Sequence, residues 1–188
     1  MPDWVASSED EELILVDTDD NVIGHLDKGA CHDRDGVLHR AFSIFIFSDT
    51  GKLLLQQRSS EKRLWPGFWS NSCCSHPRRG EDMDTALKRR LHDEFGMHSE
   101  LHFLYKFSYH AQFGDVGSER EVCSVYVGRS DDEVRANPHE IADWRWISAG
   151  DLDREMDASP KDFTPWFLQE WQEVRRSYHA VFGFSEEI

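Results

Sequence analysis

Residues 64–96 of the chain are LWPGFWSNSCCSHPRRGEDMDTALKRRLHDEFG, a stretch in which two tryptophans, two cysteines and a histidine precede a predicted helix. Its first half, with a Pro-Gly turn followed by a polar run, is typical of a loop. Its second half predicts a helix over residues 82–95, because Asp82 lies in the first turn, where the helix dipole favours anions, and Gly96 ends it.

Glu94 lies near the end of that predicted helix, on the side that carries its apolar residues. A carboxylate beside a buried apolar stripe needs a partner, and a cation is the obvious one. The alternative is an acidic side chain in solvent at a helix end, which is the common situation for an isolated glutamate. We therefore expect either a paired, functional Glu94 or an exposed one.

The length and composition of the chain favour one globular domain. Its 188 residues are enough to bury a substantial core, and the acidic, serine-rich start predicts a flexible tail over residues 1–12 before a single domain over residues 13–188. There is no run of about 18 apolar residues, and the start of the chain lacks a basic, apolar signal pattern. We therefore expect a cytoplasmic protein with no membrane partner.

The cysteines fit the same compartment. The chain has four of them, Cys31, Cys73, Cys74 and Cys123. Two are adjacent, which is poor geometry for an ordinary disulfide and fits a reducing environment. Reduced thiols can then serve as ligands or catalysts.

The charge pattern separates the whole chain from its central stretch. A net charge of -15 argues against a nucleic-acid or anionic-membrane partner, because both need a basic surface. Cations nevertheless gather around the central stretch, at Arg58, Lys62, Arg63, Arg78 and Arg79. Each taken singly would be a surface cation, but together they favour an anionic small-molecule partner. The sequence does not distinguish a monomer from a homodimer.

Outside the central stretch the pattern predicts strands and two further helices. The apolar run of residues 41–47 predicts a central strand, joined by a turn at residues 49–51 to a second strand over 52–57 in a hairpin. Ser148 caps a short helix around residues 150–156, and Thr164 with Pro165 begins a final helix. Other strands are expected over residues 13–16, 22–23, 101–113, 119–127 and 141–147, and the apolar stripe of the final helix comprises Phe167, Trp171, Val174, Tyr178 and Val181. Because strands and helices do not alternate regularly, the fold class is α+β.

Four side chains outside the central stretch are candidate metal ligands. His32 and His39 lie in a loop region that leads into the central strand, and Glu119 and Glu121 point to the same side of an extended chain. Two neighbouring carboxylates repel each other unless a cation lies between them, which favours a metal. The alternatives are loop histidines without a ligand role and an edge strand with exposed carboxylates.

The predicted helix and the residues before it resemble the Nudix signature, a Gly, five residues, a Glu, seven residues, then Arg-Glu-apolar-x-Glu-Glu-x-Gly-apolar. The positions in register are Glu81, Arg89, Leu91, Glu94, Gly96 and Met97. The departures are Asp93 for a Glu, Ser75 for the first Gly, and Arg90 where hydrolases carry a metal-binding Glu. The resemblance implies a Nudix-type α/β/α sandwich with a mixed sheet, added N-terminal strands and a C-terminal helix, and Arg90 argues against hydrolysis through the usual carboxylate cluster.

Within that superfamily the chain resembles the type 1 isopentenyl-diphosphate isomerases over about residues 13–182. The resemblance lies in residues 38–42 (LHRAF), 65–77 (WPGFWSNSCCSHP) and 119–123 (EREVC). A Cys-x-His and a Glu-x-Glu in these surroundings are a specific combination. Enzymes of that family interconvert isopentenyl and dimethylallyl diphosphate, so the resemblance implies an isomerase of isoprenoid precursor biosynthesis that acts on a small-molecule diphosphate.

The resemblance also implies roles for individual residues. It implies a divalent metal, manganese, magnesium or zinc, held by His32, His39, His76, Glu119 and Glu121. It implies a magnesium ion that bridges Glu94 to the substrate diphosphate. The phosphate-binding positions are Lys28, Arg58 and Lys62, the catalytic positions are Cys74, Glu121 and Tyr109, and the pocket aromatic that contacts the substrate is Trp166.

The implied chemistry moves a double bond through a carbocation-like state, which requires an acid and a base on opposite faces of the substrate. Cys74 and Glu121 would supply the two faces, with Tyr109 assisting the carboxyl group. The ring face of Trp166 would stabilise the cation.

Two other functions stay open on the sequence. One is a Nudix hydrolase of a nucleoside diphosphate derivative, which shares the helix but would need a Glu where Arg90 stands. The other is a non-catalytic protein with a structural zinc ion held by Cys31, Cys73 or Cys74 and His76.

Overall fold

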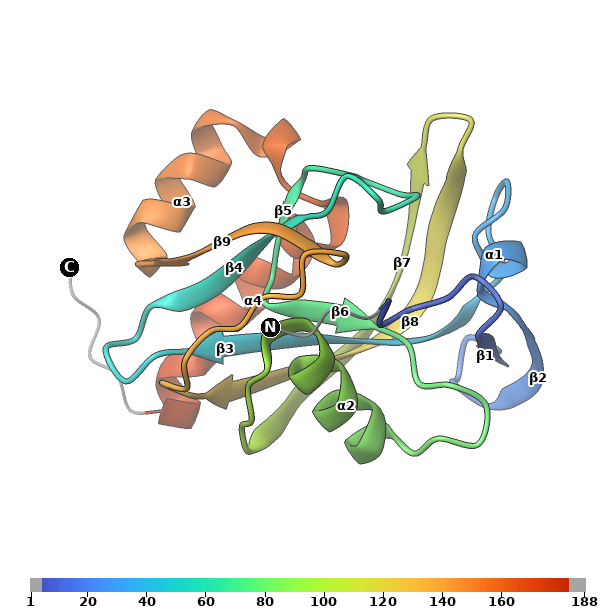
Figure 1. Cartoon of the computed structure of the whole chain (residues 1–188), viewed down its shortest axis with the longest axis horizontal. Helices are drawn as coiled ribbons and strands as arrows, with labels where there is room; N and C mark the ends of the chain where they lie inside the picture. Colours follow the sequence, from blue (N-terminus) through green and yellow to red (C-terminus); the bar gives the residue numbers. More distant parts are fainter. Residues whose placement is uncertain (1–4, 183–188) are drawn as a thin grey trace.

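The computed structural model describes residues 5–182, with side-chain surroundings up to residue 177. At its centre lies β3 (His39–Phe47), whose two faces are both covered by helices (Figure 1). Successive side chains of a strand point to opposite faces, so β3 contributes to two cores. One core joins Ala41, Phe45 and Phe47 to α3 (Ala149–Ala158) and α4 (Pro165–Phe182). The other joins Phe42, Ile44 and Ile46 to α2 (Met83–Phe95).

Among the described residues, nine strands form one mixed sheet. β8 (Gly117–Arg129) runs parallel to β3 along the whole of that strand, and β7 (Leu101–Phe113) pairs antiparallel with β8. Beyond the other side of β3, β4 (Leu53–Arg58) pairs with β9 (Ile141–Ile147) and β5 (Trp69–Ser70). β1 (Glu12–Val16) and β2 (Val22–Asp27) form a hairpin next to the start of β3. Helices on both faces of a mixed sheet confirm the α+β sandwich.

β3 and β4 separate immediately after the turn that joins them, where Phe47 pairs with Leu53. Side chains fill the gap. The hydroxyl of Ser72 accepts from the backbone N of Ile46 at 2.8 Å and donates to the carbonyl of Leu54 at 2.7 Å. The side-chain amide of Asn71 donates to the carbonyl of Ile44 at 3.2 Å. The predicted hairpin therefore exists only at its turn, because Ser72 and Asn71 replace the backbone ladder.

The sequence predicts a loop before α2, and this prediction is wrong for residues 69–70 and 73–75, which form two short strands. β6 (Cys73–Ser75) pairs antiparallel with residues 42–44 of β3, and β5 pairs with β4. These strands are two and three residues long, too short to show a period in sequence, and they form because the separated β3 and β4 offer free backbone groups. A second unpredicted element is the single turn α1 (Lys28–Cys31).

α2 forms where the sequence predicts it. The side chain of Asp82 accepts from the backbone N of Thr85 at 2.9 Å and caps the start. Gly96 ends the helix in the left-handed region at φ 66°, and its N–H donates to the carbonyl of His92 at 2.8 Å. The buried side of α2 carries Ala86, Leu87, Arg90, Leu91, Glu94 and Phe95.

The last two helices begin as the sequence predicts or close to it. Ser148 caps α3, and a 3-10 turn, η1 (Pro160–Asp162), precedes α4. Of the predicted stripe on α4, Phe167, Trp171 and Val174 are buried, whereas the side chains of Tyr178 and Val181 lie outside the described residues. At the other end Glu12 belongs to β1 and Ala6 is 4% exposed, so ordered chain begins before residue 13. None of the described helices is long and apolar enough to span a membrane.

Phe45 tests the importance of the core between β3 and α4. Its side chain is fully buried, and its ring centroid lies 5.9 Å from that of Phe167. We expect Phe45→Ala to lower the free energy of unfolding by about 3–5 kcal/mol, because it removes a buried ring and leaves a cavity. Urea denaturation measures the change. The control is Phe103→Ala on β7, where the ring is 55% exposed and the expected loss is below about 1 kcal/mol; equal losses in the two variants would contradict this account of the core.

Candidate metal and active site

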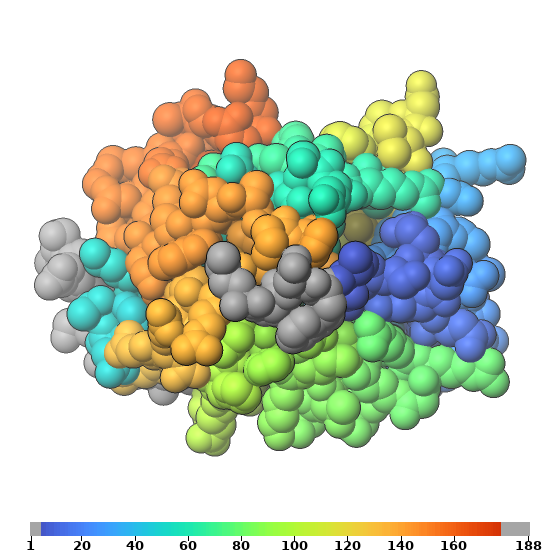
Figure 2. All heavy atoms as spheres, in the orientation of Figure 1, coloured from blue at the N-terminus to red at the C-terminus, as the bar shows by residue number. Residues whose placement is uncertain are grey.

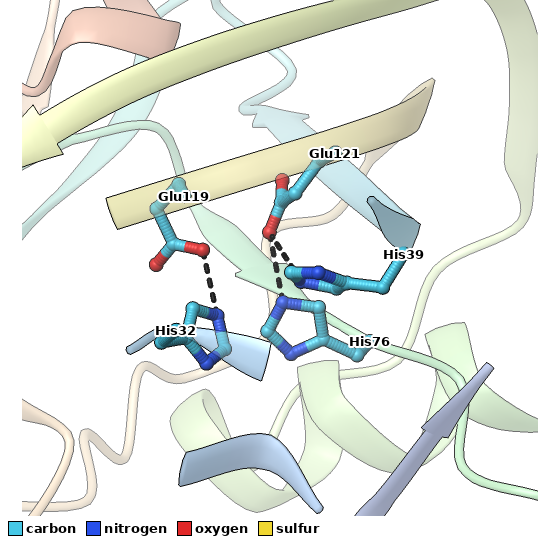
Figure 3. A group of neighbouring side chains, drawn as sticks. All are labelled: His32, His39, His76, Glu119 and Glu121. Atoms are coloured by element: carbon cyan, nitrogen blue, oxygen red, sulfur yellow. Dashed lines mark hydrogen bonds and ion pairs between the residues drawn. The ribbon is translucent and has the colours of Figure 1, made fainter. Parts of the chain in front are cut away.

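Five side chains from separate parts of the chain converge at one end of β3 (Figure 3). They are His32 after α1, His39 at the start of β3, His76 after β6, and Glu119 and Glu121 on β8. One ligand atom from each lies within 4.8 Å of the others, and all five residues are buried. The parallel register brings part of the cluster together directly, since it pairs His39 with Glu121.

Backbone carbonyls fix the orientation of two of the imidazoles. Nδ1 of His32 lies 2.6 Å from the carbonyl oxygen of Lys28, and Nδ1 of His39 lies 2.7 Å from that of Val37. A carbonyl only accepts, so each Nδ1 carries a proton and each Nε2 is turned toward the cluster, where a bound metal would take its lone pair. Metal-binding histidines are commonly oriented in this way.

The donor atoms of the cluster fit a divalent metal ion. Nε2 of His39 is buried without a hydrogen bond. Nε2 of His32 and Oε2 of Glu119 lie 2.7 Å apart as an ion pair, but they too make no hydrogen bond. Nε2 of His76 lies 2.8 Å from Oε1 of Glu121. Three imidazoles and two carboxylates are a ligand set for a divalent cation. Buried nitrogen and oxygen atoms without a hydrogen-bond partner in the protein are typical of metal ligands.

The ionisation of the two carboxylates and of His76 fits the same conclusion. Burial opposes the charge on Glu119, but His32 outweighs it and the pKa of this carboxyl is lowered. Burial also opposes the charge on Glu121, and there His39 and a hydrogen bond from Tyr109 lower the pKa. Burial, with His39 and His32 nearby, lowers the pKa of His76 well below its usual range. Ionised carboxylates and a neutral His76 are the forms that bind metals.

A cavity of about 230 Å³ opens beside this cluster. Most residues that the resemblance singles out line it, namely Lys28, His32, Arg58, Lys62, Cys74, His76, Tyr109, Glu119, Glu121 and Trp166. The two that do not line it, His39 and Glu94, are buried and contact residues that do, Glu121 and Arg90 respectively. Cations and carboxylates far apart in sequence therefore line one cavity.

Groups able to exchange protons face this cavity from two elements. On β7, the hydroxyl of Tyr109 donates to Oε2 of Glu121 at 2.6 Å, and burial, with Glu121 nearby, raises the pKa of this phenol well above its usual range. On β6, Sγ of Cys74 lies 3.8 Å from the hydroxyl of Ser70, and burial raises the pKa of the thiol to about 12, although Arg58 opposes the shift. Both the phenol and the thiol thus hold their protons at neutral pH.

An aromatic wall closes the apolar part of the cavity. Trp166, 2% exposed, has its ring centroid 5.2 Å from Trp65 in an edge-on arrangement and 6.1 Å from Tyr109. The guanidinium of Arg58 lies 5.3 Å from the centroid of the same ring, and it donates to the carbonyls of Leu64 and Trp65. Arg58 therefore connects the aromatic wall to the part of the cavity lined by Lys62 and Arg90, which we call the polar end.

At the polar end, Glu94 has the cationic partner that its position on the helix predicts. It is 2% exposed and forms an ion pair with Arg90, and its Oε2 accepts from the side chain of Gln56 at 3.0 Å. The exposed alternative for Glu94 is therefore wrong. Arg90 is equally buried and reaches a second carboxylate, Glu140, at 3.1 Å.

Sequence reasoning missed two buried acids near the cavity. Glu140 lies in a turn before β9, where no motif marks it, and it also pairs with Lys62. Glu170 on α4 lies 3.7 Å from Sγ of Cys123, and burial raises the pKa of its carboxyl to about 8. A signal existed for Glu170 alone, since it follows Trp166 by four residues and so shares a side of the helix.

The cysteines of the structural-zinc alternative do not join the metal cluster. Cys31 and Cys73 are fully buried, the latter in the core against α2, and Cys74 lines the cavity instead. Among the described residues, the group able to hold a metal consists of the histidines and glutamates alone.

Comparisons with known proteins agree with this geometry. The family model of the NUDIX domain matches residues 37–167. The chain is 46% identical over 159 residues to an isopentenyl-diphosphate Delta-isomerase of Serratia proteamaculans, covering 85% of this chain and 88% of that protein. It is 39% identical over 170 residues to isopentenyl-diphosphate Delta-isomerase 1 of Photorhabdus laumondii, covering 89% and 97%.

Solved structures show the same fold. DR0079 from Deinococcus radiodurans matches with a TM-score of 0.70 and 24% identity, over 89% of this chain and 99% of that one. The MutT protein from Methanosarcina mazei Go1 matches with a TM-score of 0.59 and 14% identity, over 74% and 95%. At these identities the likeness concerns the fold, whereas the sequence relatives define the branch: the chain belongs to the isopentenyl-diphosphate Delta-isomerases of the Nudix family.

Proposed function

We propose that this chain interconverts isopentenyl and dimethylallyl diphosphate. The observation that carries the proposal is that Cys74 and the Tyr109–Glu121 pair line one small cavity with Lys28 and Lys62. Proton-exchanging groups beside an apolar wall suit an alkene, and cations suit the diphosphate that anchors it.

Residues of this chain account for both proton movements. One group delivers a proton to the terminal methylene carbon, and the other removes a proton from the allylic carbon on the far side of the double bond. Cys74 and Glu121 come from different strands, which supports their acting on opposite faces, and Tyr109 would hold the Glu121 carboxyl by its hydrogen bond. The reaction is reversible, so each group acts as acid in one direction and as base in the other.

The aromatic wall supports the same reaction. The face of Trp166 would stabilise the developing cation by about 1–2 kcal/mol. Its burial, together with Trp65, also keeps water from a carbon that would otherwise be trapped as an alcohol.

We infer that the enzyme binds two divalent metal ions. The first, manganese, magnesium or zinc, would be held by His32, His39, His76, Glu119 and Glu121. When bound, it would supply a fixed positive charge that neutralises the paired carboxylates and tunes the acidity of Glu121. A magnesium ion would accompany the diphosphate at Glu94, whose two oxygens accept from Arg90 and Gln56 and each keep a further lone pair.

The diphosphate would lie among Lys28, Arg58 and Lys62. We place the protein in the cytoplasm and in isoprenoid precursor biosynthesis, without nucleic-acid or membrane partners. The free thiols of all four cysteines support a reducing compartment. Monomer or homodimer stays a prediction.

The first test removes the proton-exchanging groups. We expect Cys74→Ala and Glu121→Gln each to lower kcat for isopentenyl diphosphate by at least about 100-fold, because a positioned acid or base contributes that much or more. The assay follows formation of dimethylallyl diphosphate with magnesium and manganese present. Glu100→Gln on the surface is the control for the loss of one carboxylate and should keep full activity. An inactive wild type, or full activity in both variants, would sink the assignment.

The same preparation tests the hydrolase alternative. We expect no metal-dependent phosphate release from nucleoside diphosphate derivatives, because Arg90 forms buried ion pairs where a hydrolase would need a metal-binding carboxylate. Steady release by the wild type would favour that alternative.

The second test concerns the metal cluster. We expect His39→Asn to weaken Mn²⁺ binding by at least about tenfold in equilibrium dialysis, because it replaces a ligand whose orientation the carbonyl of Val37 fixes. Mn²⁺ should also raise the Tm of the wild type more than that of the variant, since it binds the folded state. The exposed His25→Asn is the matched control. Equal Mn²⁺ affinity in wild type and His39→Asn would rule out the five-residue site.

A further inference from the structure

Glu140 is a carboxylate at the end of the cavity where the proposed function places a diphosphate. It lines the cavity and is 2% exposed. Its Oε2 pairs with Nζ of Lys62 and lies 3.1 Å from a guanidinium nitrogen of Arg90, and its Oε1 accepts from the hydroxyl of Ser7 at 3.1 Å. Both oxygens are therefore engaged.

The backbone holds this carboxylate in place. The N–H of Glu140 donates to the carbonyl of Asn137 at 3.0 Å, and its own carbonyl accepts from the N–H of Ser59 at 3.0 Å. Ser59 begins the turn that carries Lys62, whose N–H donates to the carbonyl of Ser59 at 3.1 Å. The turn before β9 and the turn after β4 are thus joined next to the Lys62–Glu140 pair.

The cations at this end repel one another. The pKa of Lys28 is lowered to about 8, first by burial and then by Lys62 and Arg90. Arg90 is 2% exposed and lines the cavity, and its charge is balanced by Glu94 and Glu140. Burial opposes the charge on Glu140, but Lys62 and Arg90 outweigh it and lower the pKa of its carboxyl, so it is ionised at neutral pH. Without that charge, Lys62 would be repelled and could turn its partly exposed side chain to solvent.

We propose that Glu140 is a positioning residue that holds Lys62 and Arg90 in place for the substrate diphosphate. This role rests on the proposed function, because it presupposes a diphosphate at this end of the cavity. Glu140 makes no contact with the reacting carbons in this account; it acts through the two cations.

The N-terminal segment belongs to the same arrangement. The carbonyl of Ala6 accepts from Arg90 at 2.9 Å, and Ser7 binds Glu140. In Figure 2 the blue segment that follows the grey residues lies between the teal segment near residue 60 and the green segment that includes α2. Residues 6 and 7 therefore limit where Arg90 and Glu140 can move.

A different role for the same carboxylate predicts the opposite effect of its removal on substrate binding. If the charge of Glu140 only repelled the diphosphate, its removal would tighten substrate binding. We expect the reverse, because the cations that Glu140 holds attract the diphosphate more directly than Glu140 repels it.

The experiment compares Glu140→Gln with wild type in the full chain. We expect KM for isopentenyl diphosphate and the Kd of magnesium pyrophosphate, measured by calorimetry, each to rise at least tenfold, while kcat changes less than threefold. Glu133→Gln, in which the removed carboxylate is 76% exposed, makes the same change in net charge and should alter neither constant. An unchanged or lower KM in Glu140→Gln would overturn the proposal, as would a fall in kcat at constant KM.

Two further variants separate positioning from general damage. Lys62→Met should raise KM by itself, and adding Glu140→Gln should raise it further by clearly less than tenfold, because one of the two cations through which Glu140 acts is already gone and only Arg90 remains. Ser7→Ala leaves the buried ion pairs intact and should raise KM two- to threefold even if Glu140→Gln does not fold. Multiplicative effects in the double variant, or no effect of Ser7→Ala, would contradict the role. Pyrophosphate binding is measured independently of catalysis. If the wild type is inactive but binds pyrophosphate at least tenfold more tightly than Glu140→Gln does, only the proposed reaction is rejected.

Discussion

The separation of β3 from β4 is the constraint on which the rest of the structure depends. Two adjacent strands normally satisfy each other's backbone groups, but here the hydroxyl of Ser72 and the amide of Asn71 do so instead. The space gained admits β6 between the two halves of the sheet. Cys74 thereby reaches the interior on a strand, and His76 follows directly after it, which positions both more firmly than a surface loop would.

Charge is distributed unevenly within the cavity that results. One end carries the carboxylates of β8 with the three imidazoles, and the other carries lysines and arginines with their own counter-ions. For the proposed substrate, with its charged head and apolar tail, this distribution of charge would favour one orientation over the other. Arg58 belongs to the cationic end and connects it to the aromatic wall, since it lies over Trp166 and also binds the carbonyls of the turn at residues 64–65.

Sequence predicted the parts of this molecule that depend on local order. The helix that ends at Gly96 follows from a cap, a stripe and a glycine, and the long strands follow from apolar runs. β5, β6 and the Lys62–Glu140 pair depend on contacts between distant segments, and no short pattern marks them. Taken one at a time, the residues of the candidate site are weak evidence for a metal or a catalytic role. Only the family resemblance joins them into one site.

The parallel pairing of β3 with β8 has a consequence for folding. His39 and Glu121 become neighbours only when strands from distant parts of the sequence have paired, and contacts of that kind form slowly. A metal ion bound by a residue of each strand, His39 and Glu121, would stabilise the folded state alone, so its binding energy would add to the stability of the sheet. A substitution that unfolds these two strands would therefore also release the metal, although it leaves every ligand side chain unchanged.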